Sequence, residues 1–172
     1  MCRQLLLAMK KRGFGEGKWN GFGGKLELTP EGMPAETMVE CAQRELREES
    51  SLEVAKDQFH LQGKLRFIMK TDGMIDKHTG KEAKDLHVCV YTVDASAIAG
   101  QTPMESEEML PKWYGFDEIP FDSMWADDEL WFPLMFDGKL FDGDVIFKDK
   151  TVIASHTIAP ATELAPPACD LA

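Results

Sequence analysis

The segment from Pro34 to about Ser50 constrains the fold most, because its apolar residues recur with the period of an α-helix. At ~100° per residue, one stripe of a helical wheel collects Ala35, Met38, Val39, Ala42 and Leu46. Pro34 suits the first position of a helix, where no hydrogen bond needs its missing N–H. The sequence therefore predicts a helix over residues 34–50 with one face packed against a core.

Three glutamates lie along one flank of that stripe. Glu45, Glu48 and Glu49 have the spacing i, i+3, i+4, which brings side chains on a helix close together. Crowded carboxylates repel each other, and hard cations such as Mg²⁺ and Mn²⁺ relieve that repulsion because they prefer oxygen ligands. A solvated charged face, offset by Arg44 and Arg47, explains the same pattern. The glutamates alone leave both interpretations open.

Composition narrows the class of protein. With 172 residues, 44% hydrophobic and 28% charged, the chain fits one globular domain with a core. A net charge of -11 disfavours general binding to nucleic acid or a membrane surface, and polyphosphate binding would need a cation. The four cysteines are far apart, as in reduced thiols rather than a zinc site. The apolar run at 5–9 is too short for a signal peptide. A cytosolic location is expected, with a mitochondrial or nuclear pool left open.

Local patterns predict the remaining elements. Strands are expected at 3–10, 59–69, 86–94 and 112–116, and over 139–158 around a turn at the Asp142–Gly143 pair. A short helix at 127–136 would be capped by Asp127 or Asp128 and divided by Pro133. The expected domain covers residues 1–155, and the Ala/Pro-rich residues 156–172 are expected to be disordered.

A glycine-rich stretch, "GFGGK" at 21–25, precedes the predicted helix, and Glu36 stands eight residues before Arg44. This pattern resembles the Nudix box, G-x5-E-x7-R-E-U-x-E-E-x-G-U. The matching positions are Gly24, Glu36, Arg44, Glu45, Leu46, Glu48, Glu49 and Leu52. There are two departures: eleven residues separate Gly24 from Glu36 where the box has five, and Ser51 replaces the late glycine. A left-handed backbone there would suit serine less well than glycine.

The resemblance extends beyond the box. The stretches 9–25, 102–114, 119–136 and 139–143 are similar to the MutT-homologue branch of Nudix hydrolases, which act on oxidised purine nucleoside triphosphates. The resemblance is patchy at 53–86, where "TDGMIDKHTGKEAKD" looks like an insertion. The implied fold is of the α/β (α+β) class, a Nudix α/β/α sandwich with a mixed sheet. Members of this branch carry a first strand within roughly fifteen further N-terminal residues, so this chain is expected to lack it and to expose a sheet edge.

The resemblance also implies a metal site. Mg²⁺, or Mn²⁺ in its place, would be held by Glu45, Glu48, Glu49, Glu108 and the carbonyl of Gly23. Arg44 would orient one glutamate through a charge-assisted bond, and Glu36 would brace that arrangement. The reaction would be hydrolysis of a phosphoanhydride, giving a nucleoside monophosphate and pyrophosphate. The resemblance does not decide which carboxylate acts as general base.

A second set of residues would bind the nucleoside. The resemblance implies that Asn20, Asp127 and Asp128 read the purine, that Trp125 stacks on it, and that Phe14, Phe67 and Lys10 lie nearby. Two adjacent aspartates in an apolar pocket can exchange protons and so present different hydrogen-bond patterns. Other readings stay open: helix capping for the aspartates, a core role for Phe14 and Phe67, and a solvated turn for Lys10. Trp113, Trp131 and Phe132 are expected to serve packing.

These inferences predict a magnesium-dependent enzyme that removes oxidised purine nucleoside triphosphates from the nucleotide pool. Its partner would be a small nucleotide, with no nucleic acid and no membrane, and the chain is expected to be a monomer. One alternative is a Nudix hydrolase of another diphosphate-linked substrate, such as a dinucleoside polyphosphate or a nucleotide sugar. The other is a non-catalytic binding module with the same fold.

Overall fold

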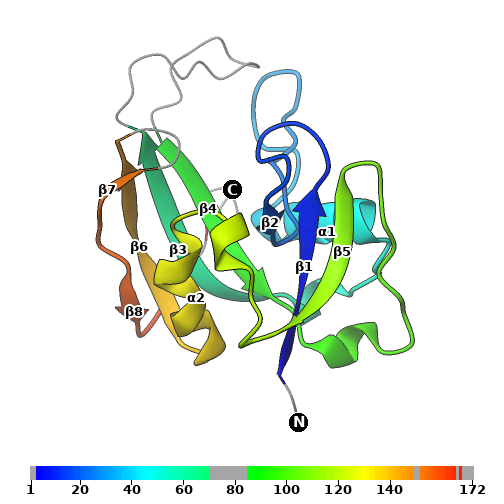
Figure 1. Cartoon of the computed structure of the whole chain (residues 1–172). Coiled ribbons are helices and arrows are strands. Elements are labelled where there is room, and N and C mark those ends of the chain that lie inside the picture. Colours follow the sequence, from blue (N-terminus) through cyan, green and yellow to red (C-terminus); the bar gives the residue numbers. More distant parts are fainter. Residues whose placement is uncertain (1–2, 70–84, 149–151, 166, 168–172) are drawn as a thin grey trace. The chain divides into compact units, whose positions relative to one another are not determined.

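The computed structural model describes residues 3–69, 85–148, 152–165 and 167 (Figure 1). Two compact units divide the chain. Unit 1 comprises Met1–His60, Tyr91–Trp125 and Pro166–Ala172, and unit 2 comprises Leu61–Val90 and Ala126–Ala165. Each unit is built around one sheet. The expected insertion at 71–85 lies almost wholly outside the described residues, and the single domain over 1–155 stays a prediction.

Unit 1 contains a three-stranded antiparallel sheet in the order β2-β1-β5. Strand β1, Gln4–Lys10, pairs with β5, Met109–Gly115, over its whole length, and β2, Trp19–Asn20, pairs with its end. Leu7 and Ala8 of β1 are fully buried, which places the core of unit 1 against this strand. The expected lack of a further strand, with the exposed sheet edge that it implies, stays a prediction.

Helix α1 spans Met38–Ser50 in unit 1 and contacts β5. It begins four residues later than predicted, because Thr37 and Glu40 form a capping box. The Thr37 hydroxyl accepts from the Glu40 N–H at 3.3 Å, and the Glu40 carboxylate accepts from the Thr37 N–H at 2.9 Å. Pro34 instead forms an isolated bridge with Leu28 before the helix. Of the predicted apolar stripe, Ala35 is exposed before the helix and the other four residues are half-buried. The fully buried residues of α1 are Cys41, Glu49 and Ser50.

Ser51 ends α1 in the left-handed conformation, with φ 60° and ψ 17°. Among the described residues it is the only non-glycine residue with positive φ, so the box position that favours glycine does need that backbone. We expect Ser51→Gly to raise the unfolding free energy by about 1 kcal/mol. The left-handed region costs an L-residue ~1–2 kcal/mol, and the greater unfolded-state entropy of glycine offsets part of that gain. Equilibrium urea unfolding measures the gain. Ser51→Ala keeps the Cβ and is the control; an equal gain from alanine would contradict the backbone explanation.

Unit 2 contains a five-stranded sheet in the order β4-β3-β6-β7, with β8 also paired to β6. Its strands are β3 His60–Met69, β4 Asp85–Thr92, β6 Leu140–Phe147, β7 Ile153–His156 and β8 Ala159–Ala161. Strand β6 runs parallel to β3 and antiparallel to β7 and β8. The sheet is therefore mixed, as predicted.

Aromatic packing on Phe141 forms the centre of unit 2. Gly63 of β3 pairs with Phe141 of β6, and a Cβ on Gly63 would lie 2.2 Å from the Phe141 ring. Helix α2, Asp128–Phe136, contributes Trp131, whose ring stacks on Phe141 with centroids 5.6 Å apart. Pro133 lies inside α2 without dividing it, so the predicted break is wrong. Of the helices in the described ranges, none has the length and apolarity needed to cross a membrane.

Two predictions for the C-terminal region are corrected. The Asp142–Gly143 pair lies inside β6 and is not a turn. Glycine is needed there because a Cβ on Gly143 would lie 2.6 Å from the Ile158 Cα. The expected disorder from residue 156 is wrong for 159–161, which form β8; residues 166 and 168–172 lie outside the described part. The remaining elements, all in unit 1, are the 3-10 turns η1 Lys56–Gln58, η2 Ala95–Ile98 and η3 Phe121–Ser123.

Candidate active site

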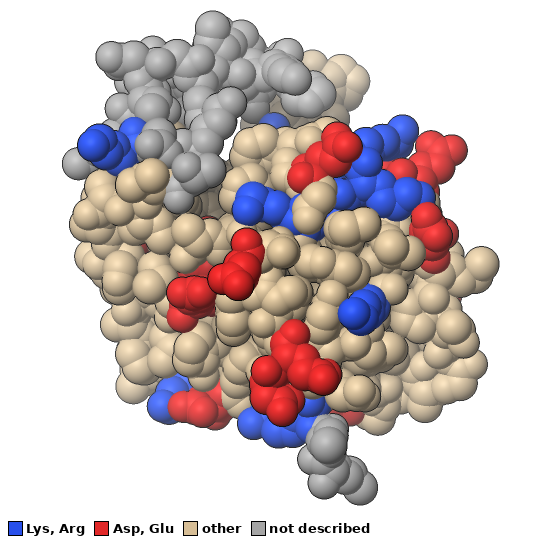
Figure 2. Space-filling view, in the orientation of Figure 1, with Lys and Arg blue, Asp and Glu red and all other residues tan. Residues whose placement is uncertain are grey.

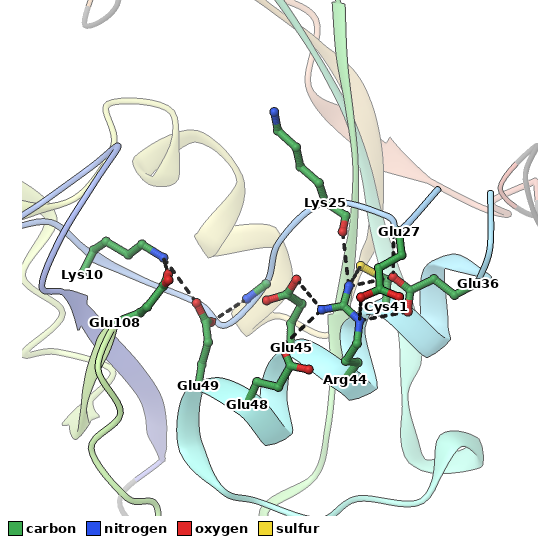
Figure 3. A network of polar contacts seen from close by, with 11 residues as sticks. Lys10, Lys25, Glu27, Glu36, Cys41, Arg44, Glu45, Glu48, Glu49 and Glu108 are labelled. Atoms are coloured by element: carbon green, nitrogen blue, oxygen red, sulfur yellow. Dashed lines mark hydrogen bonds and ion pairs between the residues drawn. The ribbon is translucent and has the colours of Figure 1, made fainter. Parts of the chain in front are cut away.

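Unit 1 holds a pocket of about 620 Å³ formed by the end of β1, the glycine-rich loop, α1 and the segment before β5. Five of its nine lining residues are glutamates. The lining consists of Lys10, Gly23, Gly24, Glu45, Glu48, Glu49, Ser106, Glu107 and Glu108. All five residues predicted to bind metal therefore line one pocket (Figure 3), although their role as ligands stays a prediction.

Arg44 organises the acidic residues on one side of this pocket (Figure 3). Its Nε and Nη2 donate to the two carboxylate oxygens of Glu36 at 3.1 and 2.7 Å. Its Nη1 donates to Glu45 at 2.8 Å and to Glu48 at 3.3 Å. The hydrogen bond from Arg44 lowers the pKa of Glu36, although partial burial opposes that shift. Arg44 is thus placed as an orienting role requires, between Glu36 and the glutamates of α1.

Glu36 is fixed from the loop side as well. The Glu27 N–H donates to Glu36 Oε1 at 3.0 Å, and Arg44 donates to the Lys25 carbonyl at 3.2 Å. The extra residues of the loop form their own small hairpin, with the Ala35 N–H donating to the Glu27 carbonyl at 2.8 Å. Leu28 pairs with Pro34 in that hairpin. The added length is therefore absorbed outside the pocket, while Glu36 keeps its contacts.

Glu49 is the buried acid of the pocket, with 5% of its surface exposed. It accepts from the Gly23 N–H at 3.0 Å, and the Lys10 Nζ lies 3.5 Å from its other oxygen. Burial raises the pKa of Glu49, while the Gly23 N–H and Lys10 oppose the shift. The carbonyl of Gly23 remains a predicted ligand.

The three glutamates of α1 do not form the tight cluster that their spacing suggests. Across the described ranges, no three Asp, Glu, His or Cys side chains are arranged to hold a metal ion as they stand. Glu45 and Glu48 turn toward Arg44, whereas Glu49 turns toward Lys10 and Gly23. Arg44 thus offsets the charges of Glu45 and Glu48, as one part of the alternative expects, while a metal-binding role for these glutamates stays a prediction.

The donor set nevertheless fits a hard divalent cation. The pocket offers carboxylate oxygens, which Mg²⁺ and Mn²⁺ prefer. It already holds one cationic group, the Lys10 ammonium, between Glu49 and Glu108. It also has a cradle that a larger residue would fill, because a Cβ on Gly24 would lie 2.1 Å from Glu45 Oε1. Metal binding by these carboxylates stays a prediction.

The Gly24 cradle leads to a prediction. Gly24→Ala should displace the Glu45 carboxylate, because the new methyl group would occupy its place. We expect a roughly tenfold loss in Mn²⁺ affinity, typical of disturbing the support of a metal ligand. The melting temperature should change little, since the displaced group is the end of a flexible side chain. Gly21→Ala is the control, because its Cβ would meet open space. Unchanged Mn²⁺ affinity in Gly24→Ala would contradict a ligand role for Glu45.

A basic turn, Lys10–Arg12, binds an acidic segment, Glu105–Glu108, at the mouth of the pocket. Figure 2 shows basic and acidic side chains side by side at the upper right, over the end of β1 and the start of β5. Lys10 donates to Glu108 Oε2 at 2.7 Å, Arg12 donates to Glu108 Oε1 at 2.9 Å, and Lys11 donates to Glu105 at 2.6 Å. The bonds from Lys10 and Arg12 lower the pKa of Glu108. The solvated-turn alternative for Lys10 is wrong, because its ammonium binds two pocket carboxylates.

Four of the predicted nucleoside-binding residues lie in unit 1: Lys10, described above, and Asn20, Phe14 and Trp125. Asn20 ends β2 and accepts from the Gly21 N–H at 2.9 Å. Phe14 stacks on Trp125, with centroids 5.0 Å apart and planes 20° apart. Phe14 is 67% exposed, so the core alternative is wrong for it. Trp125 is half-buried, and the exposed Phe14 ring offers aromatic area to a planar ligand.

The other predicted nucleoside-binding residues, Asp127, Asp128 and Phe67, lie in unit 2. Both aspartates are buried. Asp127 stands at the N-cap of α2 but makes no capping bond; instead it accepts from the Trp131 Nε1–H at 3.2 Å. Burial raises the pKa of Asp127, and the Trp131 bond opposes the shift. Phe67 packs on Phe147 within unit 2, with centroids 5.9 Å apart. Base reading by these residues together with Asn20 stays a prediction.

Comparison with known proteins gives concordant results. The family model described as "NUDIX domain" matches residues 2–135. A Danio rerio protein named "Oxidized purine nucleoside triphosphate hydrolase" is 44% identical over 163 residues, covering 94% of this chain and 90% of the relative. A Mus musculus protein of the same name is 43% identical, covering 91% and 86%.

A solved structure adds evidence on the fold. The crystal structure of a MutT protein from Bacillus halodurans matches with a TM-score of 0.67 and 23% identity, covering 90% of this chain and 89% of that one. At this identity the likeness concerns the fold alone, and it confirms the predicted fold class.

Proposed function

Because the chain belongs to the Nudix family, whose hydrolases generally use divalent metal ions, we propose that it hydrolyses oxidised purine nucleoside triphosphates to monophosphates and pyrophosphate. Mg²⁺ is the proposed metal and Mn²⁺ its substitute. The substrate class is supported by the names of relatives that share 43–44% of their residues with it over most of both chains. The observation that carries the proposal is the pocket of unit 1, where glutamates from α1 face Glu108 and a lysine.

The pocket's own residues suit this reaction. Glu45, Glu48, Glu49 and Glu108, with Gly23, would hold Mg²⁺. The bound ion would screen the triphosphate charge and favour ionisation of the attacking water. Arg44 fixes the Glu45 carboxylate through a charge-assisted bond, and Glu36 holds the guanidinium by a bidentate pair. Burial keeps the Glu49 carboxylate away from bulk water. Electrostatic interactions are stronger in the protein interior than in water.

Nucleoside selection is proposed for the second set of residues. Asn20, Asp127 and Asp128 would hydrogen-bond the purine edge, and Trp125 with Phe14 would contribute stacking area. A raised pKa at Asp127 suits this role, because a protonated carboxyl can donate while an ionised one only accepts. Such a group can match a base whose oxidation has exchanged a donor for an acceptor. Phe67 and Lys10 are proposed to lie near the bound nucleotide.

The proposal is tested by pyrophosphate release with Mg²⁺ over a panel of substrates. The panel comprises 8-oxo-dGTP, 2-hydroxy-dATP, dGTP, dCTP, a dinucleoside polyphosphate and a nucleotide sugar. We expect kcat/KM to be highest for the oxidised purines, with no activity in chelator. Faster turnover of the dinucleoside or the sugar would assign another Nudix substrate. Binding of 8-oxo-dGTP without turnover would indicate a binding module.

The remaining expectations about partners are also proposals. We propose a monomer in the cytosol, with a mitochondrial or nuclear pool left open. It would act on free nucleotides and bind neither nucleic acid nor membrane, and the net charge of -11 supports this last point. Light scattering coupled to size exclusion measures the mass in solution. A gel-shift titration with single- and double-stranded DNA tests the second point.

A further inference from the structure

Two cations bind the two oxygens of the same pocket carboxylate, Glu108. Lys10 Nζ lies 2.7 Å from Glu108 Oε2, and Arg12 Nη2 lies 2.9 Å from Glu108 Oε1. Lys10 also reaches the buried Glu49 at 3.5 Å, whereas Arg12 turns to the exposed Glu107 at 3.6 Å. Lys10 therefore lies between two pocket acids (Figure 3). Arg12, whose side chain is 57% exposed, contacts Glu108 from the more solvent-exposed part of the turn.

The position of Lys10 is one that a divalent cation would compete for. The Glu49 carboxylate is buried, and a buried charge needs a counter-charge to be stable. The Lys10 ammonium supplies that counter-charge, since it lies 3.5 Å from Glu49 and 2.7 Å from Glu108, the acids that a metal would use. Its flexible stem lets the charge leave without moving the backbone.

Arg12 differs from Lys10 in the Glu108 oxygen that it binds: Arg12 binds Oε1, and Lys10 binds Oε2. It binds the outer oxygen of Glu108, and the backbone N–H of Lys11 donates to the Glu108 carbonyl at 2.7 Å. Together these bonds fix the residue from the solvent side, so the oxygen now bound by Lys10 remains available for another partner. Lys11 binds Glu105 and the Ser106 carbonyl, and touches no pocket carboxylate in the described contacts.

We propose that Lys10 is a placeholder cation, which neutralises Glu49 and Glu108 until a divalent metal ion displaces it, and that Arg12 is a positioning residue that keeps Glu108 aimed into the pocket. This inference rests on the metal site of the proposed function. It assigns opposite effects to two neighbouring positive charges: Lys10 opposes metal binding in the nucleotide-free protein, and Arg12 supports it.

The test is a Mn²⁺ titration of the nucleotide-free full chain, followed by the electron paramagnetic resonance signal of free Mn²⁺. Lys10→Gln, Lys11→Gln and Arg12→Gln each remove one positive charge from the same turn. We expect Lys10→Gln to bind Mn²⁺ at least about fivefold more tightly, the low end of typical coupling between competing ligands. Lys11→Gln should match the parent, and Arg12→Gln should bind more weakly. Lys10→Arg keeps the charge and should restore parental affinity.

Each alternative result has a definite meaning. Equal tightening in all three glutamine variants would reduce the effect to net charge and overturn the inference. Weaker or unchanged binding in Lys10→Gln, with a parental circular dichroism spectrum, would overturn it as well, and so would the absence of Mn²⁺ binding in every variant. Pyrophosphate release from 8-oxo-dGTP is measured separately. A Mn²⁺ titration that contradicts the roles of Lys10 and Arg12 therefore leaves the proposed function intact, whereas no release from any substrate of the panel would contradict that function.

Discussion

Glu49→Gln is expected to lower Mg²⁺-dependent turnover of an oxidised purine triphosphate by about 100-fold or more, because metal-ion catalysis contributes several kcal/mol. Its unfolding free energy should stay equal or rise. Glutamine can still accept from the Gly23 N–H, whose nitrogen lies 3.0 Å from the Glu49 carboxylate. Unlike Glu49, which is 5% exposed, it would bury no charge. The substitution therefore separates catalysis from stability.

The pH dependence of stability gives the same substitution a second measurement. Burial raises the pKa of Glu49, so between the unfolded and folded pKa values the folded state binds more protons than the unfolded state. This contribution to stability is present at low pH and is lost as pH rises through the folded pKa. Metal-free Glu49→Gln should thus gain stability over the parent at pH 7 and not at pH 3. Glu53→Gln, an exposed site with the same charge change, is the control. Parental turnover in Glu49→Gln would refute the metal-site interpretation.

Asp127→Ala and Asn20→Ala are expected to reduce kcat/KM for oxidised purine triphosphates by one to two factors of ten. A buried polar partner left unpaired costs ~1–3 kcal/mol. Turnover of dCTP, held mainly through its triphosphate, should change little. Capping cannot account for a loss at Asp127, because that side chain makes no capping bond. Equal losses for dCTP and 8-oxo-dGTP would point to a structural role for its bond with Trp131.

Asp127→Asn distinguishes the charge of this residue from its hydrogen bond. The amide oxygen can still accept from Trp131, but no buried charge remains. Because burial raises the pKa of Asp127, its stabilising contribution is lost as pH rises through the folded pKa. We expect Asp127→Asn to be about 1 kcal/mol more stable than the parent at pH 7, with the gain absent at pH 3. The exposed Asp122→Asn is the control. A gain independent of pH would contradict this account.

Periodicity predicted the longer strands and helix α1, since both depend on local patterns that one chain reveals. The short strands β2 and β8 were not predicted. The start of α1 was wrong because Pro34 was weighed above the Thr37-x-x-Glu40 pattern, a capping signal equally visible in the sequence. The turn expected at Asp142–Gly143 was wrong for another reason. The glycine is required by a close approach of the Ile158 backbone, a tertiary contact that no local pattern encodes.

The candidate site shows the same division. The family pattern identified the acids of α1 and the arginine that orients them. It did not reveal that only two of the three acids, Glu45 and Glu48, contact Arg44. Arg44 draws Glu45 and Glu48 to itself while Glu49 turns away toward Lys10. The Arg12–Glu108 pair spans 96 residues of sequence and was missed. The opposite charges of the basic turn and the acidic segment were the available signal. The bond between Trp131 and Asp127 had no such signal.

The small hairpin before α1 makes this protein a suitable carrier for inserted peptides. Its base is closed by the bond between Ala35 and Glu27 and by the Leu28–Pro34 bridge, whereas its tip at Pro30 and Glu31 is exposed. Loop lengthening costs little free energy when the ends are already held together. An epitope or a fluorophore-binding tag placed between Pro30 and Glu31 would report on the protein in cells, while Glu36 and Arg44 remain fixed beneath it.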